Sequence, residues 1–128
     1  MKRILLVEDE KSTSDLVKAF LERHNFEVVV AFDGEEALAK LKKTPDLIIL
    51  DLMLPKLDGR EVLQKIRVNP KTRDIPVICF TARTESQSIF EAMEEGSFDY
   101  LIKPVDNNEL LDTIFRAFHL ADFKRNMQ

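Results

Sequence analysis

The sequence is poor in cysteine and glycine, and it contains no long apolar run. Its single cysteine, Cys79, cannot form an internal disulfide, and its apolar neighbours predict a small core residue. The three glycines, Gly34, Gly59 and Gly96, form no phosphate-binding loop, which excludes P-loop and dinucleotide-binding proteins. No stretch is apolar for long enough to cross a bilayer, and the first residues lack the features of a signal peptide. We therefore expect a cytoplasmic protein.

An excess of basic residues is also missing. The formal net charge is -4, so the domain as a whole has no electrostatic reason to bind nucleic acid. No cysteine or second histidine stands at zinc-ligand spacing from His24 or His119. The chain is 45% hydrophobic and 33% charged, which is typical of a soluble globular protein. Its 128 residues predict one domain.

Short apolar runs alternate with longer amphipathic segments, which is typical of an α/β fold. Four of the five runs are almost continuously apolar, and this indicates strands buried on both faces of a parallel sheet. The predicted strands are 3–7, 27–31, 46–50, 75–80 and 98–102.

Helical spacing of apolar residues predicts five helices between and after these strands. The third must end before Pro70, and Gly96 is a good C-cap for the fourth. The fifth is expected over 106–121, starting beside the N-cap candidate Asp106. Its apolar face is wider than docking on a sheet requires, which fits either a deeply buried helix or a surface for docking or dimerisation. We expect a domain over 1–122 and a short polar tail over 123–128.

Side chains that can take part in chemical reactions directly follow four of the predicted strands. Glu8 and Asp9 follow the first strand, Asp51 the third, Thr81 the fourth and Lys103 the fifth. Because ligands bind at the carboxyl ends of strands in open parallel sheets, we expect these side chains to converge. Three neighbouring carboxylates repel one another, so they should raise a pKa or recruit a cation. Mg²⁺ fits such oxygen ligands, with Mn²⁺ as an alternative.

Asp51 is the natural nucleophile of this cluster. Carboxylates attack phosphorus to give aspartyl phosphates, and a bound cation offsets the repulsion between the two anions. Lys103 can pair with one phosphoryl oxygen, and the Thr81 hydroxyl can donate to another. A cis peptide bond between Lys103 and Pro104 would aim the lysine inward. The residues therefore predict phosphoryl transfer to Asp51.

Four sequence motifs stand in order at the predicted strand ends. They are Leu6-Val7-Glu8-Asp9, Asp51-Leu52-Met53-Leu54-Pro55-Lys56-Leu57-Asp58-Gly59, Thr81-Ala82 and Gly96-Ser97-Phe98-Asp99-Tyr100-Leu101-Ile102-Lys103-Pro104. With these motifs the chain resembles, over essentially its whole length, the receiver domain of two-component response regulators, similar to the chemotaxis regulators. The resemblance implies a flavodoxin-like, doubly wound α/β fold with strand order 2-1-3-4-5 and five surrounding helices.

The resemblance also implies roles for single residues. Asp51 is the expected phosphoacceptor, Asp9 the direct Mg²⁺ ligand and Glu8 a nearby, often water-bridged, acid. The backbone carbonyl of Met53 would complete the protein ligands. Glu8 departs mildly from the family pattern, since many receivers have aspartate there, but it keeps the charge.

Two further pairs of residues follow from the resemblance. Thr81 and Tyr100 correspond to the family's switch pair: on phosphorylation the hydroxyl moves to the phosphoryl group and the ring turns inward, which shifts the population between two arrangements. Met53 and Arg83 stand two residues after Asp51 and Thr81, where side chains border the phosphoryl group and tune its lifetime. Their bulk is expected to obstruct the attacking water, so we predict a phosphorylated state that is not especially short-lived.

The implied function is a phosphorylation-dependent switch, not a turnover enzyme. A histidine kinase or histidine phosphotransfer protein would phosphorylate Asp51 and change the face formed by the fourth helix, fifth strand and fifth helix. The downstream protein target is not named by the sequence, and we expect neither nucleic-acid binding nor membrane association. Residues 85–95 contain no lysine or arginine, which disfavours a charged dimer through the fourth helix and favours a single-domain messenger. A homodimer through the fifth helix is the alternative.

Other functions were weighed against this one. A haloacid-dehalogenase-type phosphatase needs an acid two residues after the nucleophile, where Met53 stands. A flavodoxin needs a hydroxyl- and glycine-rich loop after the first strand, where residues 8–10 are all acidic. A non-phosphorylated adaptor stays an alternative, although Glu8, Asp9, Asp51, Thr81 and Lys103 are all present. The amino-terminal receiver of a longer DNA-binding regulator is the other alternative.

Overall fold

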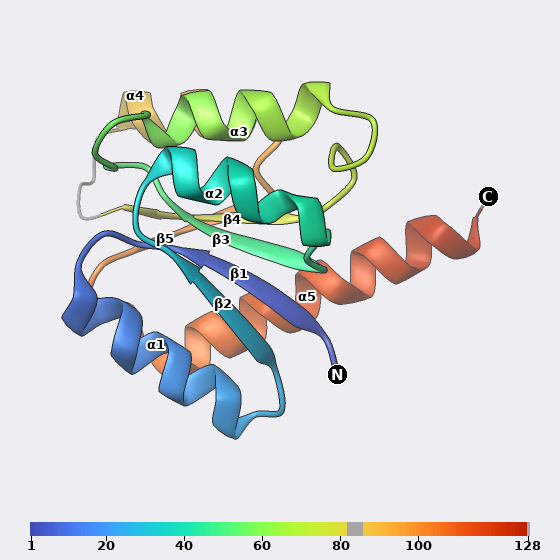
Figure 1. Cartoon of the computed structure of the whole chain (residues 1–128). Coiled ribbons are helices and arrows are strands. Elements are labelled where there is room, and N and C mark those ends of the chain that lie inside the picture. Colours follow the sequence, from blue (N-terminus) through green and yellow to red (C-terminus); the bar gives the residue numbers. More distant parts are fainter. Residues whose placement is uncertain (82–85, 128) are drawn as a thin grey trace.

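A computed structural model describes residues 1–81 and 86–127 (Figure 1). Within these residues, five strands form one parallel sheet in the order β2-β1-β3-β4-β5. This confirms the predicted fold and strand order. The strands are β1 (Arg3–Val7), β2 (Glu27–Ala31), β3 (Leu47–Asp51), β4 (Val77–Thr81) and β5 (Asp99–Ile102).

Helices cover both faces of the sheet. Figure 1 shows α1 and α5 on one face and α2, α3 and α4 on the other. A short 3-10 turn, Leu41–Lys43, extends the second helix. The helices are α1 (Lys11–Arg23), α2 (Gly34–Lys40), α3 (Gly59–Val68), α4 (Ser86–Glu94) and α5 (Asn107–Asn126).

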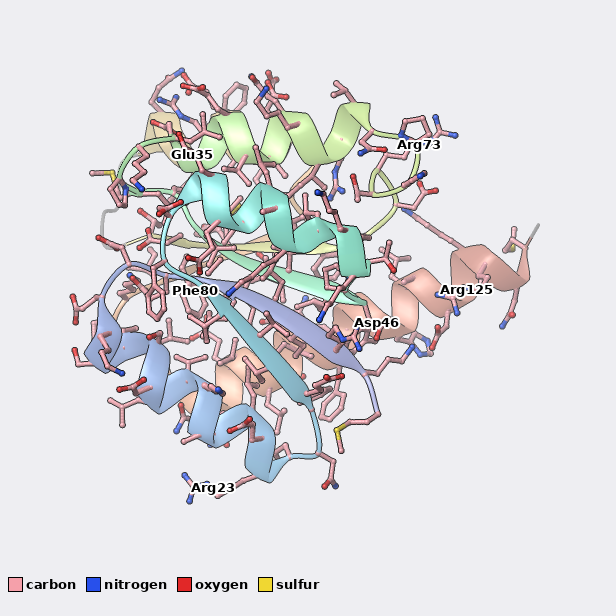
Figure 2. All side chains as sticks on the ribbon, viewed as in Figure 1. Arg23, Glu35, Asp46, Arg73, Phe80 and Arg125 are labelled. Atoms are coloured by element: carbon pink, nitrogen blue, oxygen red, sulfur yellow. The ribbon has the colours of Figure 1, made fainter. Side chains whose placement is uncertain are left out.

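The sheet separates two apolar cores because successive side chains of a strand point to opposite faces. In β3, Ile49 belongs to the core under α1 and α5, whereas Ile48 belongs to the core under α2, α3 and α4. Phe80, labelled in Figure 2, is fully buried on the α5 side. Every residue of β3 and β4 is buried, which explains why their sequences are continuously apolar instead of alternating.

Local sequence signals account for most element ends. Asp58 caps α3 by accepting a hydrogen bond from the Arg60 amide (2.8 Å), and Asp106 caps α5 by accepting from the Asn108 amide (2.7 Å). The third helix ends before Pro70, as predicted. Gly96 follows α4 with a φ of +96°, a left-handed conformation that favours glycine.

Several element ends differ from the prediction, most of them by one residue; the start of β4 and the end of α5 differ by more. β4 begins at Val77 instead of residue 75, because Pro76 has no amide hydrogen for the ladder and the Ile75 amide donates to Thr72 O in a turn. The fifth helix was expected to end at residue 121, but α5 continues through Asn126. No glycine or proline interrupts this segment, and two cations in its last turn favour a helix C-terminus.

The wide apolar face of α5 is only partly buried. Ile114 and Ala117 pack fully against the sheet, whereas Phe115 is 55% exposed and Leu120 is 39% exposed. The helix therefore buries one stripe and leaves a second apolar stripe on the surface. Within residues 1–81 and 86–127, none of the helices combines the length and apolar character that a membrane span requires.

Candidate functional site

The carboxyl ends of four strands meet at one edge of the sheet. Asp51 is the last residue of β3 and pairs with Phe80 of β4. The ladder continues one residue further, because the Leu52 amide donates to Phe80 O (3.0 Å) and the Lys103 amide donates to Thr81 O (2.8 Å). These backbone bonds hold the segments after β3 and β5 against β4.

Glu8, Asp9 and Asp51 come together at this edge. Each contributes one carboxylate oxygen, and the three oxygens lie within 4.8 Å of one another. Glu8 is 0% exposed and Asp51 is 3% exposed, whereas Asp9 faces solvent. The cluster therefore has two buried acids and one that is open to water, as expected for a cation that keeps some of its own waters.

Lys103 brings a positive charge into the same cluster. Its ammonium lies 3.0 Å from Asp51 Oδ2 and forms a second ion pair with Glu8. Burial alone would lower the pKa of Lys103, but the contacts with the two carboxylates outweigh burial and raise it. The Lys103–Pro104 peptide bond is cis. Lys103 is thus held as a cation beside the Asp51 carboxylate.

Glu8 provides the test of whether these residues fit a divalent cation. Burial raises the pKa of Glu8, and the contact with Lys103 and the bond from the Glu10 amide oppose this only in part. Glu8 Oε1 is shielded from water and, in the described part of the chain, accepts no hydrogen bond of regular geometry despite its ion pair with Lys103. A buried carboxylate oxygen with spare acceptor capacity, beside two more acids, is a donor set that suits Mg²⁺.

The turn after β3 orients Asp51. Its Oδ1 accepts a hydrogen bond from the Met53 amide (2.9 Å), and the Met53 side chain is 51% exposed. Gly59, at the start of α3, lies directly against this turn: a Cβ there would stand 2.5 Å from Asp51 O and 2.6 Å from Leu52 Cα. In the sequence Gly59 stands out only as the last residue of a motif. Its position shows that α3 approaches the acidic turn too closely for any side chain.

The structure locates one of the two switch residues at the site. Thr81 is buried at the end of β4, 2% exposed, next to the carboxylate cluster in the sheet. Tyr100 lies on β5, 37% exposed, with its backbone in register with Cys79. Its side chain is therefore at the surface. Arg83, assigned to lifetime tuning, lies outside the described residues.

The fold and the acid cluster together define a class: a doubly wound parallel α/β domain with three acids grouped at the carboxyl ends of its strands. Comparison with protein families agrees, because the model described as the response regulator receiver domain matches residues 4–115. The chain belongs to this family. Its members are signalling proteins of two-component systems that bind Mg²⁺ at an acidic pocket and interact with histidine kinases.

Individual relatives and structures show the same membership. The DNA-binding dual master transcriptional regulator RpaA of Synechocystis is 45% identical over 124 residues, covering 95% of this chain and 51% of RpaA. The transcriptional regulatory protein CpxR of Escherichia coli K12 is 39% identical, covering 98% of this chain and 54% of CpxR. The chemotaxis protein CheY4 of Vibrio cholerae superposes with a TM-score of 0.86 at 32% identity, over 91% of this chain and 98% of CheY4.

The extent of these matches differs between the two kinds of relative. The chain spans about half the length of RpaA and CpxR but nearly all of CheY4. The matched domain is therefore common to all three proteins. About half of RpaA and about half of CpxR lie outside the match.

Proposed function

We propose that Asp51 accepts a phosphoryl group from the histidine of a kinase or phosphotransfer protein, with Mg²⁺ at the adjacent acids. The observation that carries this proposal is the grouping of a buried Asp51 carboxylate with Lys103 at 3.0 Å and two further acids within 4.8 Å. No other described residues form a comparable cluster of potential metal ligands. The turn hydrogen bond from Met53 to Asp51 Oδ1 supports the role by fixing one carboxylate oxygen and leaving Oδ2 on the Lys103 side.

Asp9 and Asp51 would hold the ion directly, together with the Met53 carbonyl, and Glu8 would hold it through water. When bound, Mg²⁺ supplies the positive charge that lets an anionic phosphoryl group approach a carboxylate. Lys103 would neutralise part of the same charge, because its ammonium can donate to a phosphoryl oxygen once Asp51 carries the phosphoryl group as an acyl phosphate. Burial of the cluster strengthens each of these contacts.

Thr81 and Tyr100 would transmit the phosphorylated state. The buried Thr81 hydroxyl would donate to a phosphoryl oxygen, and the exposed Tyr100 ring would turn inward, changing the face of α4, β5 and α5. To move such an equilibrium from mostly off to mostly on takes about 5 kcal/mol of differential stabilisation. A few charge-assisted hydrogen bonds of about 1.5–3 kcal/mol each can supply this.

Intact mass spectrometry after incubation with a small acyl phosphate and Mg²⁺ tests the proposal. The wild-type chain should gain one phosphoryl group, and Asp51→Asn or a chelator should abolish the gain. The matched control is Asp15→Asn, because Asp15 is an exposed acid on α1 whose ion pair, within the described residues, is with Lys11. An unmodified wild-type mass would favour the adaptor function instead.

A second candidate function is the phosphorylation input of a DNA-binding regulator. RpaA and CpxR are both named as transcriptional regulators, and the chain aligns with about half of each. The coding sequence after codon 128 tests this candidate: a winged-helix or other DNA-binding domain there would support it, and a stop codon would favour the single-domain messenger.

A further inference from the structure

A cavity of about 560 Å³ lies at the edge of the sheet opposite to Asp51. Pro76 and Phe98, which line it, directly precede β4 and β5, whereas Asp51 and Thr81 stand at the far ends of their strands. The remaining walls come from α3, the α3–β4 connection and the last turns of α5. The cavity is therefore separate from the carboxylate site by the length of a strand.

The lining of this cavity is strongly basic. Arg67, Arg73, Lys124 and Arg125 line it, and Asp74 is the single carboxylate among the lining residues. Figure 2 shows Arg73 and Arg125, from distant parts of the sequence, at the same end of the molecule. A chain with a formal net charge of -4 thus concentrates cations in one concave place. When the walls of a cavity carry charges of one sign, they focus the electric field there and raise the local concentration of counter-ions.

Arg67 is a partly buried cation whose hydrogen-bond partners are neutral. Its guanidinium donates to the carbonyl oxygens of Gly96 (2.7 Å), Arg73 (2.9 Å) and Ile75 (2.8 Å). Among the described residues it forms no ion pair, and burial lowers its pKa. A partly buried cation that donates to neutral carbonyls, and that Asp74 attracts without a direct ion pair, is stabilised further by an added anion.

The other cations are available for a ligand. In the described ranges neither Arg73 nor Lys124 forms an ion pair, and Arg125 pairs with Asp122 only at 3.6 Å, with both side chains mostly exposed. Exposed pairs of this kind contribute little. Phe98 and Leu120 add apolar surface to the same walls, which suits the ring of a ligand.

We propose that this basic cavity binds a phosphorylated small molecule that carries at least two adjacent phosphates, as in a nucleoside di- or triphosphate. The volume lies within the range of about 300–1,000 Å³ that is usual for small-molecule sites. A nucleic-acid duplex would need an extended basic surface along which its phosphates lie, not a concave pocket in an acidic protein. A bound polyphosphate would bridge Arg73 and Lys124, and so fasten the end of α5 to the α3–β4 connection.

The test is a titration of the 128-residue chain with ATP and with pyrophosphate, in a chelator so that no divalent cation can recruit phosphate to Asp51. Amide chemical shifts in two-dimensional NMR should change saturably at Arg73, Gly96 and Lys124 with both probes, or with ATP alone if the ring is required. The double variant Arg73→Gln/Lys124→Gln should weaken binding by about tenfold or more, since it removes two charge-assisted contacts.

The matched control is Arg23→Gln/Lys65→Gln, which removes the same charge from exposed positions outside the cavity. This variant should bind within about twofold of the wild type, because exposed charges that do not line the cavity are screened by solvent and salt and cannot contact the ligand. Equal weakening in the two double variants would overturn the proposal, as would shifts confined to Asp9 and Asp51 or the absence of saturation. The wild-type shift map decides the question even if a double variant is destabilised.

Discussion

At the scale of single residues, Cys79 shows how burial controls the chemistry of a side chain. It lies in β4, and burial raises the pKa of its thiol to about 11, with Ser97 and Arg67 opposing this only in part. At about pH 8, only about one thiol in a thousand would be ionised. We predict that iodoacetamide labels the native chain far more slowly than the chain in concentrated urea, as measured by intact mass. Similar rates in the two conditions would contradict the buried position of the thiol.

Replacing Gly59 tests whether the close packing of α3 against the turn after β3 is needed to hold Asp51 in place. Gly59→Ala would place a Cβ 2.5 Å from Asp51 O, and backbone atoms of the β3–α3 turn would have to move. We expect a loss of about 1–3 kcal/mol in the free energy of unfolding, as for other overpacked sites. Phosphorylation by an acyl phosphate should also slow, because the displaced turn carries Asp51.

Glu61→Ala is the control for Gly59→Ala. Glu61 is exposed in the first turn of the same helix, so its truncation should leave both the urea midpoint and the phosphorylation rate nearly unchanged. An unaltered phosphorylation rate in Gly59→Ala, beside a normal unfolding curve, would show that the turn accommodates the methyl group.

The sequence predicted which residues converge at the site, but not how each one is buried or packed. Their order along the chain predicted that Glu8, Asp51 and Lys103 converge, because parallel strands bring their carboxyl ends to one edge. The different burial of Glu8 and Asp9 was not predictable, since it depends on where β1 stops and which way each side chain then points. The close approach of Gly59 to Asp51 depends on packing between α3 and β3, which leaves no signal in the sequence beyond the glycine itself.

At the scale of elements, the apolar runs predicted every strand and helix, but not all of their ends. β1 and β2 have the predicted bounds, and β1 is flanked by the polar residues Lys2 and Glu8. β4 starts late because of Pro76, which the apolar run concealed. α5 is longer than its apolar pattern because Lys124 and Arg125 near its end are good helix formers and need no core contact.

Arg67 holds three segments together through hydrogen bonds, so we predict that its replacement destabilises the domain. Its guanidinium joins α3 to the segment before β4 and to the turn before β5 through bonds to Ile75 O and Gly96 O. Arg67→Met should lower the free energy of unfolding by about 1–3 kcal/mol, because three backbone carbonyls lose a charged hydrogen-bond donor. Arg67→Lys should recover little, since a single ammonium cannot reach all the carbonyls that the planar guanidinium spans.

Urea unfolding followed by far-UV circular dichroism measures both Arg67 variants. Lys65→Met serves as the control, because Lys65 is an exposed residue of the same helix. If Arg67→Lys recovers the wild-type urea midpoint in full, the positive charge alone stabilises this position. The several hydrogen bonds of the guanidinium would then not be needed.

At the scale of the whole molecule, charge is divided between the two edges of the sheet. Acids gather at the carboxyl ends of the strands, around Asp51, and cations gather at the amino ends, around the basic cavity. The two edges attract ligands of opposite sign, so a divalent cation and a polyphosphate can bind without competing. α5 links them, since it starts soon after Lys103 and its last turn lines the cavity.

Metal binding should therefore change the stability of the entire domain. Mg²⁺ at about one hundred times its dissociation constant should stabilise the native state by about 2.7 kcal/mol, because it binds the folded acids and not the unfolded chain. Thermal melts with Mg²⁺ and with chelator measure the shift.

Asp9→Asn should abolish the shift and also raise the melting temperature in chelator, since it removes one of three mutually repelling carboxylates. Glu35→Gln, an exposed acid of α2, should keep the full response. An unchanged Mg²⁺ shift in Asp9→Asn would mean that the ion binds elsewhere, and the carboxylate edge would then lose its role as the metal site.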